Sequence, residues 1–164
     1  KIKYTHSGVL SSSIAMDKEI SKKIFLKNNI LTPKYFKFKF NEFNRISELK
    51  KKIKSRLSFP VVVKPFNEGS SVEVYICNEK DFFKNLKKLS PYKEIMIEKY
   101  IPGREIQIAI MGNRKLGAIE LVPKRKFYDY QAKYNAKSKT KHIIPVEINK
   151  KKNKWSFKYC HESA

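Results

Sequence analysis

Cysteine is scarce in this sequence, and its placement excludes two common ways of stabilising a small domain. The chain of 164 residues has only 2 cysteines, Cys77 and Cys160, which lie far apart and form no Cys-x-x-Cys pair. This spacing indicates neither a zinc site nor a disulfide framework. His6, His142 and His161 form no recognisable ligand spacing either. We expect no metal site built from these residues, and a reducing cytoplasm as the location.

Long apolar runs are also missing. No segment approaches the roughly 20 consecutive apolar residues that a membrane helix needs, and the amino terminus lacks the layout of a signal peptide. The sequence therefore predicts a soluble protein with no membrane partner. Its hydrophobic content of 41%, including aromatic residues at 13% of the chain, is sufficient for a core.

Acidic residues are few, since 15 Asp plus Glu stand against 37 Lys plus Arg, and the formal net charge is +22. Such an excess ordinarily points to nucleic acid. The lysines are instead spread along the chain, with short runs at 50–52 and 150–152 and no recognisable nucleic-acid module. We expect no specific nucleic-acid ligand and only salt-sensitive adhesion to polyanions. A basic polyanion-binding remnant stays open as an alternative, and it predicts binding that ignores nucleotide identity.

The most informative segment that the sequence does contain is Lys-Pro-Phe-Asn-Glu-Gly-Ser-Ser-Val at 64–72. The apolar run before it predicts a buried strand, so that Lys64 would project where the strand meets the loop. Gly69 would let the backbone approach a phosphate, and Ser70 and Ser71 offer hydroxyl and N–H donors. We call residues 67–71 the serine loop. It is typical of nucleotide triphosphate binding, although a plain hairpin loop could have the same composition.

Hydrophobic periodicity predicts a mixture of helices and strands. The expected elements are a helix around 16–28 with Ser13 as an early cap, a strand at 35–40, a helix with apolar positions 46, 49, 53 and 57, strands at 60–66 and 72–76, a helix around 82–89, and a strand at 94–98. Because the serine loop is too short for a parallel crossover, we expect an antiparallel sheet backed by helices on one face.

The second half of the chain predicts a hairpin followed by a long polar segment. Residues 105–111 and 115–121 would form the hairpin, joined by Gly112-Asn113. From 123 to 141 the sequence becomes polar and basic. A segment of this length without regular structure is usually a functional lid or disordered.

Several further blocks occur in an order that is familiar from one enzyme family. They are Tyr-Thr-His-Ser-Gly-Val-Leu at 4–10 leading to Met-Asp-Lys at 16–18, Ile-Glu-Lys-Tyr-Ile at 97–101, Gly-Arg-Glu at 103–105, and Phe-Tyr-Asp-Tyr-Gln-Ala-Lys-Tyr at 127–134. Together with the serine loop, they resemble D-alanine:D-alanine ligase, a family of ATP-grasp enzymes. The Tyr-Asp-Tyr-x-Ala-Lys-Tyr block separates this family from other ATP-grasp ligases. The resemblance runs from about Tyr4 to about Pro145.

The resemblance implies the fold class α+β, with the antiparallel sheets and packed helices of an ATP-grasp fold. It divides the chain into a lead-in segment (1–16), a first lobe with the serine loop (17–99) and an incomplete second lobe (100–164). The second lobe would include the lid (123–141) and a divergent tail (146–164). Because the family also has an amino-terminal domain and a carboxy-terminal metal-binding segment, we interpret the sequence as a partial chain and expect it to be inactive alone.

The resemblance also implies which residues bind the nucleotide. The ATP phosphates would be contacted by Lys18 and Lys64, together with Ser70 and Ser71. The adenine would be held by Glu98, Lys99 and Ile101, and Phe127 would line its pocket. Glu105 would accept the ribose hydroxyls. A carboxylate that accepts two hydroxyl donors is chemically reasonable. The competing interpretation makes the lysines solvated surface charges and the two glutamates exposed residues flanking a turn.

Three residues would take part in the reaction itself. Ser70 and Tyr134 match a serine and a tyrosine that hydrogen-bond each other when the lid closes over substrate. Lys133 matches the lid lysine that reaches the transferred phosphoryl group, where it would offset developing charge. Alternatively, the tyrosine-rich segment simply packs on the surface.

Two departures from the family pattern bear on activity. Glu73 stands where the family usually has glycine, and its charge would repel ATP if the side chain pointed inward. After Pro145 the expected magnesium ligands do not appear, and Glu147 and Glu162 do not match them. Magnesium is expected for the intact family, whereas this sequence predicts no metal ligands.

The resulting hypothesis is an ATP-dependent carboxylate-amine ligase related to D-alanine:D-alanine ligase. Its substrates would be ATP and D-alanine, joined through an acyl phosphate to make the dipeptide of peptidoglycan precursors. Another ATP-grasp amino-acid ligase is the alternative within the same class. The sequence does not indicate the second substrate or the oligomeric state.

Overall fold

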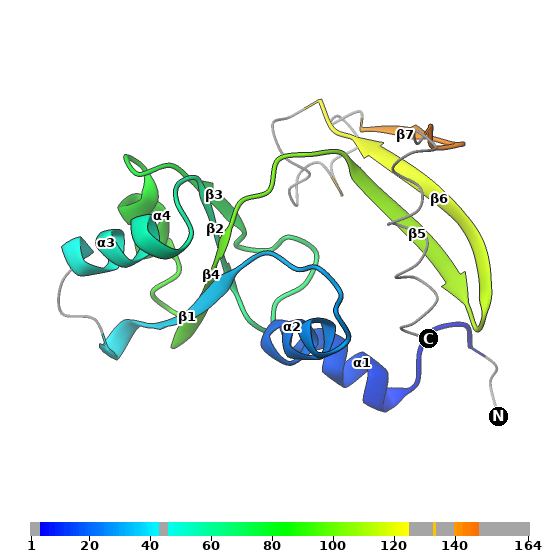
Figure 1. The fold of residues 1–164 in the computed structure, drawn as a ribbon, viewed down its shortest axis with the longest axis horizontal. Helices are drawn as coiled ribbons and strands as arrows, with labels where there is room; N and C mark the ends of the chain where they lie inside the picture. Colours follow the sequence, from blue (N-terminus) through cyan, green and yellow to red (C-terminus); the bar gives the residue numbers. More distant parts are fainter. Residues whose placement is uncertain (1–3, 43–45, 125–132, 134–139, 148–164) are drawn as a thin grey trace.

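The computed structural model describes residues 4–42, 46–124, 133 and 140–147, and these form two antiparallel sheets with flanking helices (Figure 1). The elements are α1 (Val9–Met16), α2 (Lys18–Lys27), β1 (Tyr35–Lys39), the 3-10 helix η1 (Phe40–Glu42), α3 (Ile46–Arg56), β2 (Val61–Pro65), β3 (Tyr75–Cys77), α4 (Phe82–Lys88), β4 (Glu94–Lys99), β5 (Glu105–Met111), β6 (Arg114–Val122) and β7 (Lys141–Ile143). Within these described ranges, none of the helices has both the length and the apolar character needed to cross a membrane.

The first sheet has the strand order β1-β4-β2-β3, and each neighbouring pair is antiparallel. This confirms the expected strand direction. The third predicted strand, at 72–76, is partly wrong, because β3 begins only at Tyr75. Ser71 and Glu73 have positive φ angles of 60° and 53°, which an extended strand cannot accommodate. Residues 70–73 therefore form a turn.

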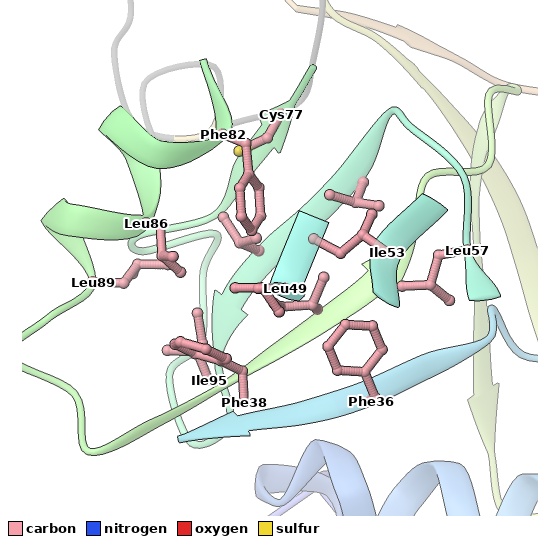
Figure 2. Close-up of a cluster of buried hydrophobic side chains, with 13 residues drawn as sticks. Phe36, Phe38, Leu49, Ile53, Leu57, Cys77, Phe82, Leu86, Leu89 and Ile95 are labelled. Carbon is pink, nitrogen blue, oxygen red and sulfur yellow. The ribbon is translucent and has the colours of Figure 1, made fainter. Parts of the chain in front are cut away.

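The core lies between the first sheet and helices α3 and α4 (Figure 2). Alternation along β2 buries Val61 and Val63. Alternation along β1 likewise buries Phe36 and Phe38. The core-facing residues of both helices, and the residue that follows each helix, are fully or nearly fully buried, namely Leu49, Ile53, Leu57, Phe82, Leu86 and Leu89. The predicted apolar stripes of α3 and α4 are thus confirmed as the faces that pack on the sheet, except at Ile46 and Phe83, which are 36% and 39% exposed.

Helix α2 covers the opposite face of the same sheet, so the expectation of helices on one face only is wrong. Its Lys22 contacts Glu98 of β4, and Glu98 stands across from Val62, which alternates with the core residues of β2. Apolar periodicity could not predict this contact, because the residues that meet there are charged. Lys22 is the only buried residue of α2.

The start of α2 also differs from the prediction. Asp17, not Ser13, is the N-cap, and its side chain accepts hydrogen bonds from the backbone N–H groups of Glu19 and Ile20 at 2.8 and 3.0 Å. Ser13 lies inside α1, a separate short helix that periodicity did not predict. An aspartate that satisfies two free N–H groups explains why the chain restarts a helix at Lys18.

The second sheet has the order β5-β6-β7. The predicted hairpin is confirmed, with Gly112 at a φ of 54° in the turn between β5 and β6. Strand β7 was not predicted, and it pairs with the end of β6 through contacts such as Leu121 with His142. Most of the predicted lid, including residues 125–132 and 134–139, lies outside the described residues.

A short connector, residues 100–104, joins the two sheets. At its first end, the N–H of Tyr100 donates to the carbonyl of Pro60 at 3.3 Å. At its other end, Arg104 forms a two-pronged ion pair with Glu120 of β6, with Nε donating to Oε1 at 2.6 Å and Nη2 to Oε2. Both ends of the connector are therefore fastened, one to each sheet.

Candidate functional site

A cavity of about 390 Å³ lies on the α2 side of the first sheet, between the serine loop and the connector. It brings together predicted site residues that are distant in sequence, namely Lys18, Lys64, Ser70, Ser71, Glu98, Lys99 and Ile101. Val62 lines the cavity while its neighbours Val61 and Val63 are buried in the core. The period-2 alternation of β2 thus places Lys64 on the cavity side.

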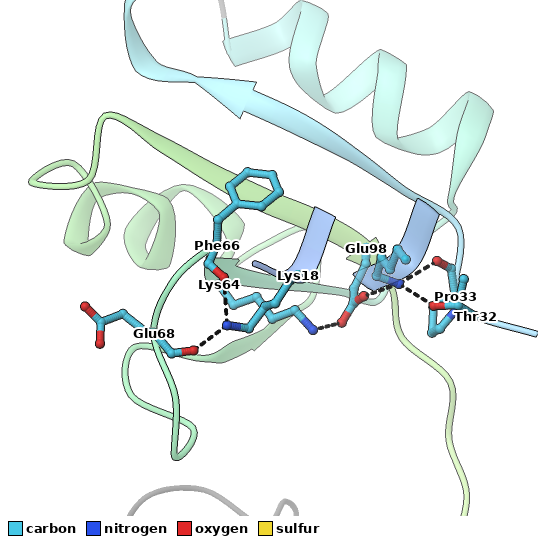
Figure 3. Close-up of polar contacts among 8 residues, drawn as sticks. Lys18, Thr32, Pro33, Lys64, Phe66, Glu68 and Glu98 are labelled. Carbon is cyan, nitrogen blue, oxygen red and sulfur yellow. Dashed lines mark hydrogen bonds and ion pairs between the residues drawn. The ribbon is translucent and has the colours of Figure 1, made fainter. Parts of the chain in front are cut away.

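Lys64 and Glu98 form an ion pair at the floor of this cavity (Figure 3). The two residues come from the adjacent strands β2 and β4. Lys64 Nζ donates to Glu98 Oε1. Both side chains are largely withdrawn from solvent, with exposed fractions of 19% and 9%. Glu98 is thus a buried charged residue at the site, and the view that it is an exposed residue beside a turn is wrong.

The other oxygen of Glu98 is held by Lys22, a residue that the sequence analysis missed. Lys22 Nζ lies 2.9 Å from Glu98 Oε2. It also donates to Thr32 Oγ1 at 2.8 Å and to the carbonyl of Pro33 at 2.9 Å. Burial lowers the pKa of the Lys22 ammonium, and the hydrogen bond to Glu98 opposes that shift. One signal was available, because Lys22 follows Lys18 by one helical turn and so shares its face.

Lys18 fixes the path of the chain into the serine loop. Its Nζ donates to the carbonyl of Phe66 at 2.9 Å and to the carbonyl of Glu68, as Figure 3 shows. Burial lowers the pKa of Lys18, and the nearby Lys64 lowers it further. Smaller effects of opposite sign come from Glu68, Glu98 and Asp17. The view of Lys18 as a solvated surface charge is therefore wrong, and the cavity holds a local excess of positive charge suited to an anionic ligand.

The serine loop contains a tight turn. The N–H of Val72 donates to the carbonyl of Gly69 at 2.9 Å, and the two central residues, Ser70 and Ser71, have φ angles of 49° and 60°. Positive φ at both central positions is the pattern of a type I′ turn. A Cβ at Gly69 would meet nothing within 4 Å. The protein itself therefore leaves open space beside Gly69.

Glu73 points away from the cavity. Its Oε2 accepts a hydrogen bond from the Tyr75 hydroxyl, and Tyr75 stands across from the core residue Val63. Burial raises the pKa of Tyr75 to about 12, and the Glu73 hydrogen bond adds to this shift. The Glu73 carboxylate therefore binds Tyr75 on the core side of the sheet. It does not point into the cavity, where its charge would repel ATP.

The remaining predicted residues lie apart or outside the described part of the chain. Glu105, at the start of β5, does not line the cavity. Loss of hydration raises the pKa of its carboxyl, and the charge of Lys133 opposes this shift. Phe127 and Tyr134 lie outside the described residues. The predicted contact between Ser70 and Tyr134 stays a prediction.

The carboxylates that the structure describes do not gather into a metal site. Over residues 4–42, 46–124, 133 and 140–147, no group of three or more His, Cys, Asp or Glu residues could hold a metal ion. Magnesium prefers oxygen ligands from one or two carboxylates together with phosphates. Glu98 is the acid at the cavity floor, and two lysines already occupy its oxygens. These residues do not fit a magnesium site.

Sequence comparison finds a matching family model over most of the chain. The model described as "D-ala D-ala ligase C-terminus" matches residues 24–160. The match continues well past Pro145, so the expectation that the resemblance ends near that residue is wrong. A D-alanine–D-alanine ligase of Pelagibacter ubique is 67% identical over 152 residues, covering 92% of this chain and 49% of its own length. One from Wolbachia pipientis wMel is 43% identical over 90% of this chain and 45% of its own.

Solved structures of similar proteins share the fold. A D-alanine–D-alanine ligase from Bacillus anthracis superimposes with a TM-score of 0.69 at 36% identity, over 90% of this chain and 47% of that one. The same enzyme complexed with ATP gives a TM-score of 0.63 at 32% identity, over 90% and 45% of the two chains. VanG D-Ala:D-Ser ligase from Enterococcus faecalis gives a TM-score of 0.68 at 27% identity, over 88% of this chain and 43% of that one. The chain spans about half the length of the relatives it matches.

Proposed function

The chain belongs to the D-alanine–D-alanine ligase family, and from this premise we propose that its cavity binds ATP for the ligation of two D-alanine molecules. The observation that carries the proposal is the convergence of Lys18, Lys64 and the serine loop on one cavity of the first sheet. A similar solved protein forms a complex with ATP. The positive charge of the cavity supports an anionic ligand of this kind.

The reaction that we propose has two steps. A carboxylate oxygen of one D-alanine attacks the terminal phosphorus of ATP, the bond to the bridging oxygen breaks, and ADP leaves with that electron pair. The amine of the second D-alanine then attacks the carbonyl carbon of the acyl phosphate, phosphate leaves, and the amine nitrogen loses a proton. Both steps depend mainly on positioning and on charge stabilisation by the protein.

The described residues divide these tasks between phosphate and base. Lys18 and Lys64 offset the charge of the phosphates, and the donors of Ser70 and Ser71 orient them. Lys133 offsets charge on the transferred phosphoryl group.

The base and sugar occupy the end of the cavity toward the connector. Glu98, Lys99 and Ile101, which line this end, hold the adenine, and Glu105 receives the ribose hydroxyls. Phe127 stacks on the adenine and Tyr134 pairs with Ser70 over the substrate. This assignment requires the second sheet to close toward the first, because Glu105 lies outside the cavity lining.

Two lobes divide this work in the proposal. Residues 17–99 carry the first sheet and most of the cavity lining, and residues from 100 onward carry the second sheet together with the lining residues Tyr100 and Ile101. We place the reaction in the cytoplasm, which supplies ATP and keeps the free thiol of Cys77 reduced. Magnesium has no assigned ligand in this proposal, and no step is attributed to it.

A calorimetric titration of the full chain with ATP tests the proposal. We expect saturable binding that a Lys64→Met variant weakens by roughly tenfold to a hundredfold, the range that follows from losing a charged hydrogen bond. Lys54→Met is the matched control, because Lys54 pairs with Glu79 on the surface at 2.6 Å and does not line the cavity. Equal affinity of wild type and Lys64→Met would contradict the assigned site.

The same titration separates the second candidate function. The net charge of +22 favours general polyanion binding, which predicts equal affinity for ATP and GTP and loss of binding at high salt. Nucleotide binding in the cavity predicts a preference for ATP that persists in salt. Absence of saturable ATP binding would overturn the proposed function.

A further inference from the structure

Lys22 stands behind the wall of the cavity and is nearly removed from solvent, with an exposed fraction of 6%. It is not among the residues that line the cavity. It nevertheless contacts two that do, Glu98 through the carboxylate and Pro33 through the carbonyl. Any effect of Lys22 on a ligand must therefore pass through these neighbours.

The contacts of Lys22 match the hydrogen-bonding capacity of an ammonium group. Its three N–H donors meet three acceptors, Glu98 Oε2 at 2.9 Å, Thr32 Oγ1 at 2.8 Å and the Pro33 carbonyl at 2.9 Å. These acceptors come from β4 and from the segment between α2 and β1. Lys22 thus fastens two neighbouring parts of the cavity wall, Glu98 and Pro33, to one point on α2. A buried charge is costly unless it is paired in this way.

Glu98 is consequently held at both oxygens. Lys64 donates to Oε1 and Lys22 to Oε2, so rotation of the carboxylate would break an ion pair in either direction. A carboxylate held in this way only accepts hydrogen bonds. Each oxygen keeps a lone pair for a further donor. An exocyclic amino group of a purine base can use it, whereas a carbonyl at the same position is repelled.

We propose that Lys22 is a positioning residue that makes the site selective for a purine bearing an amino group over one bearing a carbonyl, by fixing the Glu98 carboxylate as a hydrogen-bond acceptor. This inference rests on the proposed function, because it concerns the nucleotide in the same cavity. Without Lys22, the carboxylate can rotate toward Lys64. A rotated carboxylate no longer presents its lone pair to the amino group, so discrimination between the bases is lost.

The test measures the affinities of the full chain for ATP and GTP by calorimetry. Lys22→Met is expected to lower the ratio of ATP to GTP affinity by about tenfold, the size of one charged hydrogen bond. Lys23→Met is the matched control, since it removes the same charge from the next residue of α2. Lys23 pairs with Glu19 at 2.9 Å and its side chain is 65% exposed. The control is expected to leave the ratio unchanged.

A double-mutant cycle with Glu98→Gln shows whether Lys22 acts through Glu98. In the Glu98→Gln background, Lys22→Met is expected to have no further effect on the ratio, because the carboxylate that Lys22 positions is already gone. Lys22→Arg, which keeps the charge, is expected to restore most of the selectivity. If Lys22→Met fails to fold, Lys22→Gln and Lys22→Arg provide the same comparison of neutral and charged side chains.

The outcomes separate this inference from the function on which it depends. If wild type does not bind ATP saturably, the proposed function fails and the inference fails with it. If wild type prefers ATP and Lys22→Met weakens both nucleotides equally, the function stands and Lys22 is only structural. If the effect of Lys22→Met persists in the Glu98→Gln background, the route through Glu98 is wrong.

Discussion

Three of the lysines around the cavity, Lys18, Lys22 and Lys64, differ in what neutralises them. Lys22 and Lys64 both contact the Glu98 carboxylate. The contacts described for Lys18 are instead with the backbone carbonyls of Phe66 and Glu68, which carry no formal charge. Lys18 is therefore the ammonium that gains most from an arriving anion. Burial and the nearby Lys64 lower the pKa of Lys18, which agrees with its lack of a neutralising carboxylate contact.

The first prediction concerns the pH dependence of ATP affinity. In the empty cavity the pKa of Lys18 lies below its ordinary value of 10.5, and bound phosphate raises it again. Affinity should be constant at neutral pH and should fall once the pH exceeds the lowered pKa, because the ammonium is then lost before ATP binds. Titrations of wild type between about pH 7 and pH 10 measure this.

A Lys18→Met variant provides the comparison for this pH profile. It should bind ATP roughly tenfold more weakly at neutral pH and should lack the part of the alkaline fall that belongs to Lys18. An identical alkaline profile in wild type and variant would show that another group titrates.

At this scale, motif order located most of the cavity but not its supporting contacts. Lys18, Lys64 and Glu98 could be predicted because each lies in a recognisable block. Helical spacing places Lys22 on the face of Lys18, but it does not predict the contact with a distant strand from which the role of Lys22 arises. The direction of Glu73 was likewise unpredictable, since strand alternation fails where successive residues adopt positive φ angles.

Among the elements, α2 has the largest influence on the site, because it carries both Lys18 and Lys22. Its first turn is held by Asp17, whose carboxylate accepts two backbone hydrogen bonds. A change at this cap therefore reaches the phosphate end of the cavity through Lys18 and the base end through Lys22.

The second prediction tests this cap. Asp17→Ala should lower the free energy of unfolding by about 1 kcal/mol, the usual value of an N-cap, and should weaken ATP binding by disordering the start of α2. Asp17→Asn should retain most of the stability. Ser13→Ala is the control, because Ser13 lies within α1. Urea denaturation measures the stability, and a larger loss for Ser13→Ala than for Asp17→Ala would refute the assignment of the cap.

Elements with an apolar face could be predicted, and the others could not. The apolar stripe that includes Leu49 and Ile53 predicted α3, and both side chains are fully buried in the structure. Strand β7 is three residues long and exposed throughout, so it has no alternation to detect. The placement of α2 was missed because its contact with the sheet is made by ion pairs.

For the whole molecule, the excess of 37 basic over 15 acidic residues sets the response to salt. Like charges spread over a small chain repel one another and favour expanded states. Counterions at physiological ionic strength screen this repulsion beyond about 8 Å. The folded state is thus expected to gain stability from added salt, although individual surface ion pairs are weakened.

The third prediction follows from this charge. Raising sodium chloride from about 0.01 M to about 0.15 M shortens the screening length from about 30 to about 8 Å and should raise the thermal midpoint of the full chain by a few °C. ATP at constant ionic strength should raise it further through binding to the folded state. Differential scanning calorimetry measures both shifts. The prediction fails if the midpoint falls with added chloride, and the ATP increment should vanish in Lys64→Met.

The fastening of the connector at both ends has a mechanical consequence. With Tyr100 bonded to the first sheet and Arg104 to the second, bending is confined to residues 101–103. Strand β5 has 7 residues and is about 24 Å long, so a rotation of about 10° at this pivot moves its far end by about 4 Å. Because Ile101 also lines the cavity, a ligand in the cavity contacts the pivot itself. A small displacement of Ile101 would therefore be amplified at the far end of β5.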